Sequence, residues 1–199
     1  MLHTLIINVF LTILLLIGTN TLMADETYFE LGFRGGIGAS SVAREEQNNY
    51  RAQLAYGLGL SLSYHANDLL DLEINLLLNQ RRALTGQGSS ITINYLSLPF
   101  MVKTDPLNLG VFFTAGIQMD FLMKASADDR FGNSVDIFSQ LNGLVYDLIF
   151  GIGYHTGIIS IELRYEFGVS DLIKDESNFG AVRERNNSLL LFIGANFKL

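Results

Sequence analysis

The feature that most constrains this chain is a strict alternation of apolar and polar residues. In the stretch ISIELRYEFG, residues 159–168, apolar side chains occupy the odd positions, and Ser, Glu, Arg and Gly occupy the even ones. A period of two is typical of a β-strand whose two faces differ in chemistry. Seven further segments repeat the pattern, and no stretch after residue 24 has a convincing helical period. The sequence therefore predicts an all-β chain.

The eight alternating segments follow one another as the strands of an up-and-down meander. They are TYFELGFRGGIG (27–38), QLAYGLGLSLSY (53–64), LDLEINLLLN (70–79), YLSLPFMVK (95–103), VFFTAGIQMDFL (111–122), LVYDLIFGIGYH (144–155), ISIELRYEFG (159–168) and SLLLFIGANFKL (188–199). Longer polar loops are expected at 39–50, 82–90, 124–142 and 169–187, and short turns at 65–68, 104–108 and 155–157. Long loops at one rim and short turns at the other are typical of a membrane barrel, and an even number of strands closes without a free edge.

The composition of the two strand faces indicates which face meets water. In a soluble eight-stranded barrel, bulky residues fill the interior, and Lys, Thr and Glu cover the outside. Here the polar face is mostly Gly, Ala, Ser and Asn with a few acids and arginines, which suits a narrow lumen with paired charges. The apolar face is long enough for tilted strands to cross the apolar band of an outer membrane. We therefore expect an eight-stranded antiparallel transmembrane β-barrel, with a soluble ligand-binding barrel as an alternative.

Aromatic residues provide a second indication of a membrane. Outward-facing aromatic side chains are expected in two groups, one near the short turns and one near the long loops: Phe29, Tyr64, Phe100, Tyr154 and Phe197, and then Phe121, Tyr146, Tyr165 and Phe167. Two such belts are expected where rings meet lipid headgroups. Ordinary strand aromatics are the alternative, because strand propensity alone enriches Tyr and Phe.

The first residues of the chain predict export. The apolar run Leu5–Ile17 is followed by polar residues and then by LMA before Asp25, which indicates a signal peptide at 1–24 and a mature barrel domain at 25–199. An N-terminal membrane anchor is the alternative, although the run falls short of the ~20 residues that a spanning helix needs. The absence of cysteine fits an oxidising compartment and excludes a thiolate metal site.

The overall charge excludes one class of partner. The formal net charge is -7 at pH 7, whereas binding of nucleic-acid phosphates requires clustered Lys and Arg. We expect no nucleic-acid partner and no cofactor.

Several motifs resemble those of a known family. The mid-chain stretch INYLSLPFMVK (93–103), the segments GVFFTAGIQMDFLMK and DLIFGIGYHTGIISIELRYEFGVSDL, and the ending GANFKL resemble the PorT-like outer-membrane β-barrel domain family of Bacteroidota. The likeness covers nearly all of the mature chain. It departs at Ser97, where the family usually has Glu. The resemblance implies a barrel in the bacterial outer membrane, and some members of the group are linked to secretion or gliding machinery.

Candidate chemistry is sparse. His65 and His155 both fall in expected turns, and neither has a sequence-near serine and acid that would indicate acyl transfer. We expect no catalytic residue, but an outer-membrane lipid-modifying enzyme remains an alternative, which would need a Ser or an acid beside a His at one rim. Turn histidines are usually ordinary polar residues.

Two loops contain groups of charged residues. The first loop contains Asp128, Asp129 and Asp136, whose carboxylates could provide oxygen ligands for Ca²⁺. It lacks the spacing of a recognised calcium loop, so we expect no metal site. The second loop contains acids and bases together: Asp175, Glu176, Arg183, Glu184 and Arg185. Its arginines could bind lipopolysaccharide phosphates. The default interpretation is a mobile loop with balanced charge.

The polar strand face predicts a charged lumen. Glu162, Arg164 and Glu166 alternate on one strand, and their expected partners across the barrel are Glu30, Arg34, Asp71, Glu73, Asp120 and Asp147. Because an eight-stranded barrel has room for little more than side chains, we expect a plug of paired charges, with a small channel as the alternative.

The expected function follows from the expected fold. We predict a non-enzymatic integral outer-membrane protein whose four long surface loops carry a structural or interaction role. Its expected partners are membrane lipid, other envelope proteins and, during biogenesis, the outer-membrane assembly machinery. The ending with Phe197 and Leu199 facing outward resembles the terminal strand signal that this machinery reads.

Overall fold

The computed structural model describes most of the chain after its first residues. The described residues are 27–44, 51–67, 69–84, 90–107, 109–129, 131, 133–173 and 184–199. The expected signal peptide at 1–24 lies outside them. Among these described residues, no helix is both long and apolar enough to cross a membrane.

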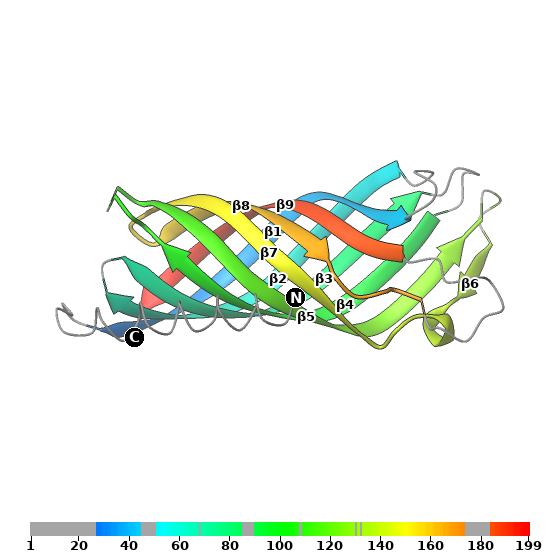
Figure 1. Ribbon diagram of the computed structural model, residues 1–199, viewed down its shortest axis with the longest axis horizontal. Helices are drawn as coiled ribbons and strands as arrows, with labels where there is room; N and C mark the ends of the chain where they lie inside the picture. The colour runs from blue at the N-terminus through cyan, green and yellow to red at the C-terminus, as the bar shows by residue number, and fades with distance from the viewer. Residues whose placement is uncertain are drawn as a thin grey trace, which may run out of the picture.

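Eight long antiparallel strands close into one barrel (Figure 1). Each strand pairs with its neighbour in the chain, and β9 returns to pair with β1, so Phe33 lies opposite Leu60 on one side and Ala195 on the other. A short strand β6 (Ser134–Asp136) adds to the end of β5, and a 3₁₀ turn follows at Phe138–Gln140. The eight barrel strands are β1 (Tyr28–Arg44), β2 (Arg51–Asn67), β3 (Leu70–Leu84), β4 (Ser90–Thr104), β5 (Val111–Asp128), β7 (Leu144–Thr156), β8 (Ile159–Gly168) and β9 (Glu184–Lys198). The expected fold is confirmed.

The strands reach further than the alternation predicted. β1 continues to Arg44, β5 continues to Asp128 and β9 begins at Glu184, all within stretches expected to be loops. Backbone hydrogen bonds extend a strand pair whatever its side chains are, whereas the alternation ends where the outer face leaves the apolar band. The four expected loops at 39–50, 82–90, 124–142 and 169–187 are therefore shorter. The expected turns at 65–68 and 155–157 likewise begin within β2 and β7.

The apolar face of every strand points out of the barrel. Leu58 is 65% exposed and Phe33 is 60% exposed, whereas Arg164 between its glutamates is 0% exposed. The aromatic residues of both expected belts also lie on this outer face, with Phe29 and Tyr146 both more than two-fifths exposed. A soluble barrel would bury these side chains. The structure therefore has the reversed polarity of a membrane barrel.

Small residues on the inner face make room for large ones. A Cβ atom built on Gly194 would lie 2.6 Å from Nη1 of Arg34, and one built on Gly36 would lie 2.6 Å from the ring of Phe192. Both distances are well inside van der Waals contact. The glycine enrichment of the strands thus accommodates large side chains in a narrow lumen.

Candidate functional site

Among the residues that the structure describes, nine charged side chains of the strands are buried in the lumen. Five are acids and four are bases, which leaves a formal excess of one negative charge: Glu73, Asp120, Asp147, Glu162 and Glu166, against Arg34, Arg81, Lys103 and Arg164. They divide into two clusters along the barrel axis. We call these the turn-side cluster (Arg34, Glu73, Lys103, Glu162 and Arg164) and the loop-side cluster (Arg81, Asp120, Asp147 and Glu166).

The turn-side cluster is centred on one carboxylate oxygen. Oε2 of Glu73 accepts from Arg34 at 2.6 Å, from Lys103 at 2.7 Å and from Ser63 at 3.0 Å. Glu162 accepts two hydrogen bonds of 3.1 Å from Arg164 and lies 3.5 Å from Nζ of Lys103. Three bases therefore face two acids, and most of the charged atoms are partnered.

The loop-side cluster has the opposite arrangement. A single nitrogen, Nη2 of Arg81, lies 2.7 Å from Asp147, 2.7 Å from Glu166 and 2.9 Å from Asp120. The guanidinium also stands over the ring of Tyr95, with 5.4 Å between Cζ and the ring centroid. One base thus serves three acids, each 0–2% exposed.

An apolar layer lies between the two clusters on part of the barrel wall. On β3, Leu77 lies between Glu73 and Arg81, and on the inner face it packs with a group of buried apolar residues: Ala55, Leu190 and Phe192. The Arg164 guanidinium stands over the Phe192 ring at 4.4 Å. Uncharged side chains therefore divide the two clusters on β3, whereas on β8 Arg164 and Glu166 are inward-facing neighbours.

A second apolar layer covers the lumen at the long-loop rim. We call it the apolar cap; its buried residues are Val42, Ala83, Ile93, Tyr95, Leu122, Ala125, Leu141, Val145 and Leu172. Seven of these are strand residues, whereas Leu141 and Leu172 come from the loops and are tied together by the hydrogen bond from the Asn142 backbone N–H to the Leu172 carbonyl. The loop-side cluster thus lies beneath a layer that excludes water.

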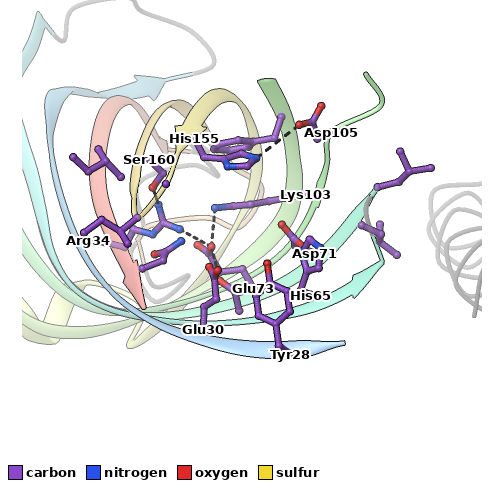
Figure 2. Close-up of a pocket in the computed structure, with 18 residues that line it drawn as sticks. Tyr28, Glu30, Arg34, His65, Asp71, Glu73, Lys103, Asp105, His155 and Ser160 are labelled. Carbon is purple, nitrogen blue, oxygen red and sulfur yellow. Dashed lines mark hydrogen bonds and ion pairs between the residues drawn. The ribbon is translucent and has the colours of Figure 1, made fainter. Parts of the chain in front are cut away.

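The opposite end of the lumen is open. A pocket of about 370 Å³ lies at the short-turn rim. Figure 2 shows Arg34, Glu73 and Lys103 among the residues that line it. His65 forms an ion pair with Asp71 and stacks on Tyr28 at the mouth. Three members of the turn-side cluster line this pocket, whereas no member of the loop-side cluster does.

A tight turn holds one acid at the mouth of this pocket. Burial alone would raise the pKa of the Asp105 carboxyl, but the backbone N–H groups of Gly110 and Leu109 donate to it at 2.7 and 3.2 Å and hold its pKa below the usual value. Nε2 of His155 lies 3.7 Å from the same carboxylate. The acid thus orders the turn between β4 and β5.

The structure brings acids to both candidate histidines but does not assemble a catalytic triad. The hydroxyl of Ser160, which is paired in register with His155, accepts from Arg34 at 2.6 Å. Among the described residues, no hydrogen bond joins Ser160 to either histidine. The acids that the lipid-modifying enzyme alternative required lie beside the histidines. In the part of the chain that the structure describes, no serine hydroxyl donates a hydrogen bond to a histidine.

Two acids of the candidate calcium loop, Asp129 and Asp136, accept hydrogen bonds from backbone N–H groups. Asp129 accepts from the backbone N–H groups of Phe131 and Asn133, and Asp136 accepts from Phe138. Within the described part of the chain, no group of three or more acids and histidines is arranged to hold a metal ion. Of the mixed-charge loop, only Glu184 and Arg185 fall in the described residues, and both lie in β9.

The charged lumen was predicted in outline, but two of its partners were missed. Glu162 and Arg164 pair as neighbours on β8, whereas Glu166 pairs with Arg81 instead of Arg164. Glu30 and Asp71 lie near the pocket mouth rather than in either cluster. The two bases that were missed, Arg81 and Lys103, are at inward-facing positions of β3 and β4. The alternation of the two strands was the signal that could have revealed them.

A closed barrel with an apolar exterior and a buried charged lumen is a transmembrane β-barrel. Residues 21–174 match the family described as outer membrane protein beta-barrel domain, and the chain belongs to this family. The protein is an integral protein of the bacterial outer membrane. No curated protein matches the chain in sequence.

Solved outer-membrane barrels have similar folds. Neisserial surface protein A is 12% identical with a TM-score of 0.55, and the match covers 87% of this chain and 100% of that one. Ail of Yersinia pestis, solved with the heparin analogue sucrose octasulfate, is 18% identical with a TM-score of 0.49, covering 85% and 99%. OprG of Pseudomonas aeruginosa is 12% identical with a TM-score of 0.43, covering 88% and 98%. The likeness to the Neisserial protein supports the eight-stranded fold.

Proposed function

We propose that this protein is a non-enzymatic, non-conducting barrel that presents its long loops for a structural or interaction role at the cell surface. The observation that supports this proposal is the filling of the lumen. Charged side chains cross-link the strands at two levels, and apolar layers lie between and above them. A lumen of this width has no space left for a continuous water path.

Conductance across a lipid bilayer tests the closed lumen. We expect the purified protein to produce no steady ion current in a planar membrane at neutral pH. The matched control is a double variant, Leu141→Ser with Leu172→Ser, which weakens the apolar cap without removing a lumenal charge. A steady current from the unaltered protein would show a channel and contradict the proposal.

An interaction role also requires the long loops to face outward. Single cysteines at Asp129 and, outside the described residues, at Glu45 and Glu176 are expected to react with an impermeant thiol reagent on intact cells. Cysteines at Asn67 and Asp105 are expected to react only after the cells are broken, because the short turns would face the periplasm. Labelling of Asn67 on intact cells would reverse this orientation.

The finer family assignment suggests a class of partner. The likeness to the PorT-like group supports a role beside secretion or envelope machinery, with other envelope proteins meeting the loops. Cross-linking from the same loop cysteines in intact cells would identify such a protein. Recovery of lipid alone would limit the role to the membrane.

The proposal of a non-enzymatic role is supported by the hydrogen bonding of Ser160. Its hydroxyl accepts a hydrogen bond from Arg34 rather than donating to a base, which is unlike an activated nucleophile. An activity-based serine probe is therefore expected to leave the folded protein unlabelled. Labelling that disappears in Ser160→Ala would favour the lipid-modifying alternative.

A further inference from the structure

The loop-side cluster has more negative charge than its surroundings compensate. Asp120, Asp147 and Glu166 all contact one nitrogen of Arg81, so full ionisation would leave two excess negative charges in a space that is 0–2% exposed. The cost of an uncompensated buried charge is several kcal/mol, which is enough to change the protonation state of the group instead. The apolar cap above the cluster limits relief by solvent.

Arg164 does not provide the missing charge. Arg164 and Glu166 are neighbours on the inner face of β8, but Arg164 donates both of its hydrogen bonds to Glu162. All described charged or titratable groups that face the cluster are these: Arg81 from β3, Tyr95 from β4, Asp120 from β5, Asp147 from β7, and Arg164 and Glu166 from β8. Among the buried lumenal residues of the described strands, the acids also outnumber the bases, by five to four.

Two acceptors of the cluster have no hydrogen-bond partner in the described part of the chain. Gln118, 0% exposed, donates through Nε2 to both oxygens of Asp120, at 2.9 and 3.1 Å. Its own carbonyl oxygen has no partner among the described residues, and neither has Oε1 of Glu166. A carboxyl group that carries a proton is a donor, whereas a carboxylate only accepts. A proton on one carboxyl group would supply a donor beside these acceptors. The guanidinium of Arg81 and the hydroxyl of Tyr95 also have unused donors, so the charge excess is the observation that favours a bound proton.

We propose that the loop-side cluster is a proton-binding site, in which Asp120, Asp147 and Glu166 together hold at least one proton at neutral pH. The ligand is the proton itself, shared among carboxyl groups that converge on Arg81. A metal ion fits less well, because the guanidinium already occupies the point where the three acids meet. The proton is retained in the folded barrel and released on unfolding, because exposed carboxyls ionise above a pH of about 4.

This release has a measurable consequence for stability. The folded state binds more protons than the unfolded state, so stability falls as pH rises from about 4 until the cluster ionises. Each retained proton raises the equilibrium constant for unfolding about tenfold per pH unit. We expect this slope in urea unfolding of the barrel refolded in lipid vesicles, between pH 5 and the pH at which the cluster loses its proton.

Neutral replacements provide the matched test. Asp147→Asn combined with Glu166→Gln leaves one acid, Asp120, for one base, Arg81, and is expected to remove about one tenfold step per pH unit from the slope. Glu162→Gln in the turn-side cluster is the control, since it removes a lumenal acid and is expected to leave the slope unchanged. Equal slopes for the unaltered protein and the double variant would overturn the proposal.

Infrared spectroscopy tests the bound proton directly. The folded, unaltered barrel at pH 7 is expected to show the C=O stretch of a protonated carboxyl group, and the double variant is expected to lose it. This measurement on the unaltered protein decides the question even if the variants do not fold. Absence of the band would overturn the proposal, and stability that rises with K⁺ concentration at fixed ionic strength would replace the proton with a metal cation.

Discussion

The two charge clusters of the lumen partner their buried charges in opposite ways. In the turn-side cluster, three donors surround one oxygen of Glu73, whereas in the loop-side cluster one nitrogen of Arg81 serves three acids. The first cluster borders an open pocket, and the second lies beneath the apolar cap. Water at the open end can compensate an imbalance, but the covered end must do so with its own groups. Both the ratio of bases to acids and the neighbouring pocket distinguish the two clusters, while the charged side chains of both are almost fully buried.

The largest expected effect comes from removing the single base of the loop-side cluster. Arg81→Met leaves three buried acids without a base, so we expect a loss greater than the ~3–5 kcal/mol of one broken buried pair. The variant should fail to show the heat-modifiable gel mobility of a folded barrel. Adding Asp120→Asn, Asp147→Asn and Glu166→Gln should restore folding. Normal folding of Arg81→Met alone would mean that the cluster is solvated.

The corresponding change in the turn-side cluster should be milder. Arg164→Ala is expected to cost about 3 kcal/mol, the lower end for a broken buried pair, because Lys103 still faces Glu162 at 3.5 Å. Urea unfolding in vesicles measures the loss. Glu162→Gln should recover part of it, whereas Glu166→Gln should not, since Glu166 is bound to Arg81. A loss below ~1 kcal/mol, typical of an exposed pair, would show that the lumen is wet.

The apolar cap should affect one end of the lumen only. Leu172→Ala is expected to cost about 2 kcal/mol through the cavity it leaves. Amide hydrogen exchange should become faster at cap residues such as Val145, whereas residues around the turn-side pocket keep their protection. Faster exchange at both ends would show that the two regions are coupled through the barrel wall.

The smallest effect is expected at the pocket mouth. Because the folded-state pKa of Asp105 is lowered, its contribution to stability is present above a pH of about 4 and is lost as pH falls through the folded-state value. Asp105→Asn should therefore be less stable than the unaltered protein at pH 7 and equal to it near pH 2. A difference that persists at pH 2 would assign the effect to turn geometry instead of charge.

The strand faces were predictable because alternation is a local property. Each residue from Ile159 to Gly168 shows its face by its parity, and the burial pattern of β8 follows that parity throughout. The contrast between large apolar residues outside and small polar ones inside then fixed the polarity of the barrel. No long-range information was needed for either step.

The pairing of charges was not predictable in the same way. Parity places Arg164 and Glu166 on one face, but the register across seven other strands decides that Glu166 meets Arg81. The cap was missed for a similar reason, because Leu141 and Leu172 lie in loops without a period. Which loop residues fold over the barrel depends on the tertiary structure, and no repeat in the sequence announces it.

The apolar cap also divides the loops by their tolerance of new sequence. Leu141 and Leu172 bury their side chains over the barrel, and the side-chain amide of Asn142 donates to the carbonyls of Asp171 and Ile173. A foreign epitope inserted at Leu141 or Leu172 would displace buried side chains and uncover the lumen. In the loop that contains Leu141, the side chain of Phe131 is 82% exposed and does not cover the lumen. A peptide inserted there would leave the apolar cap in place, because exposed loop positions tolerate insertions.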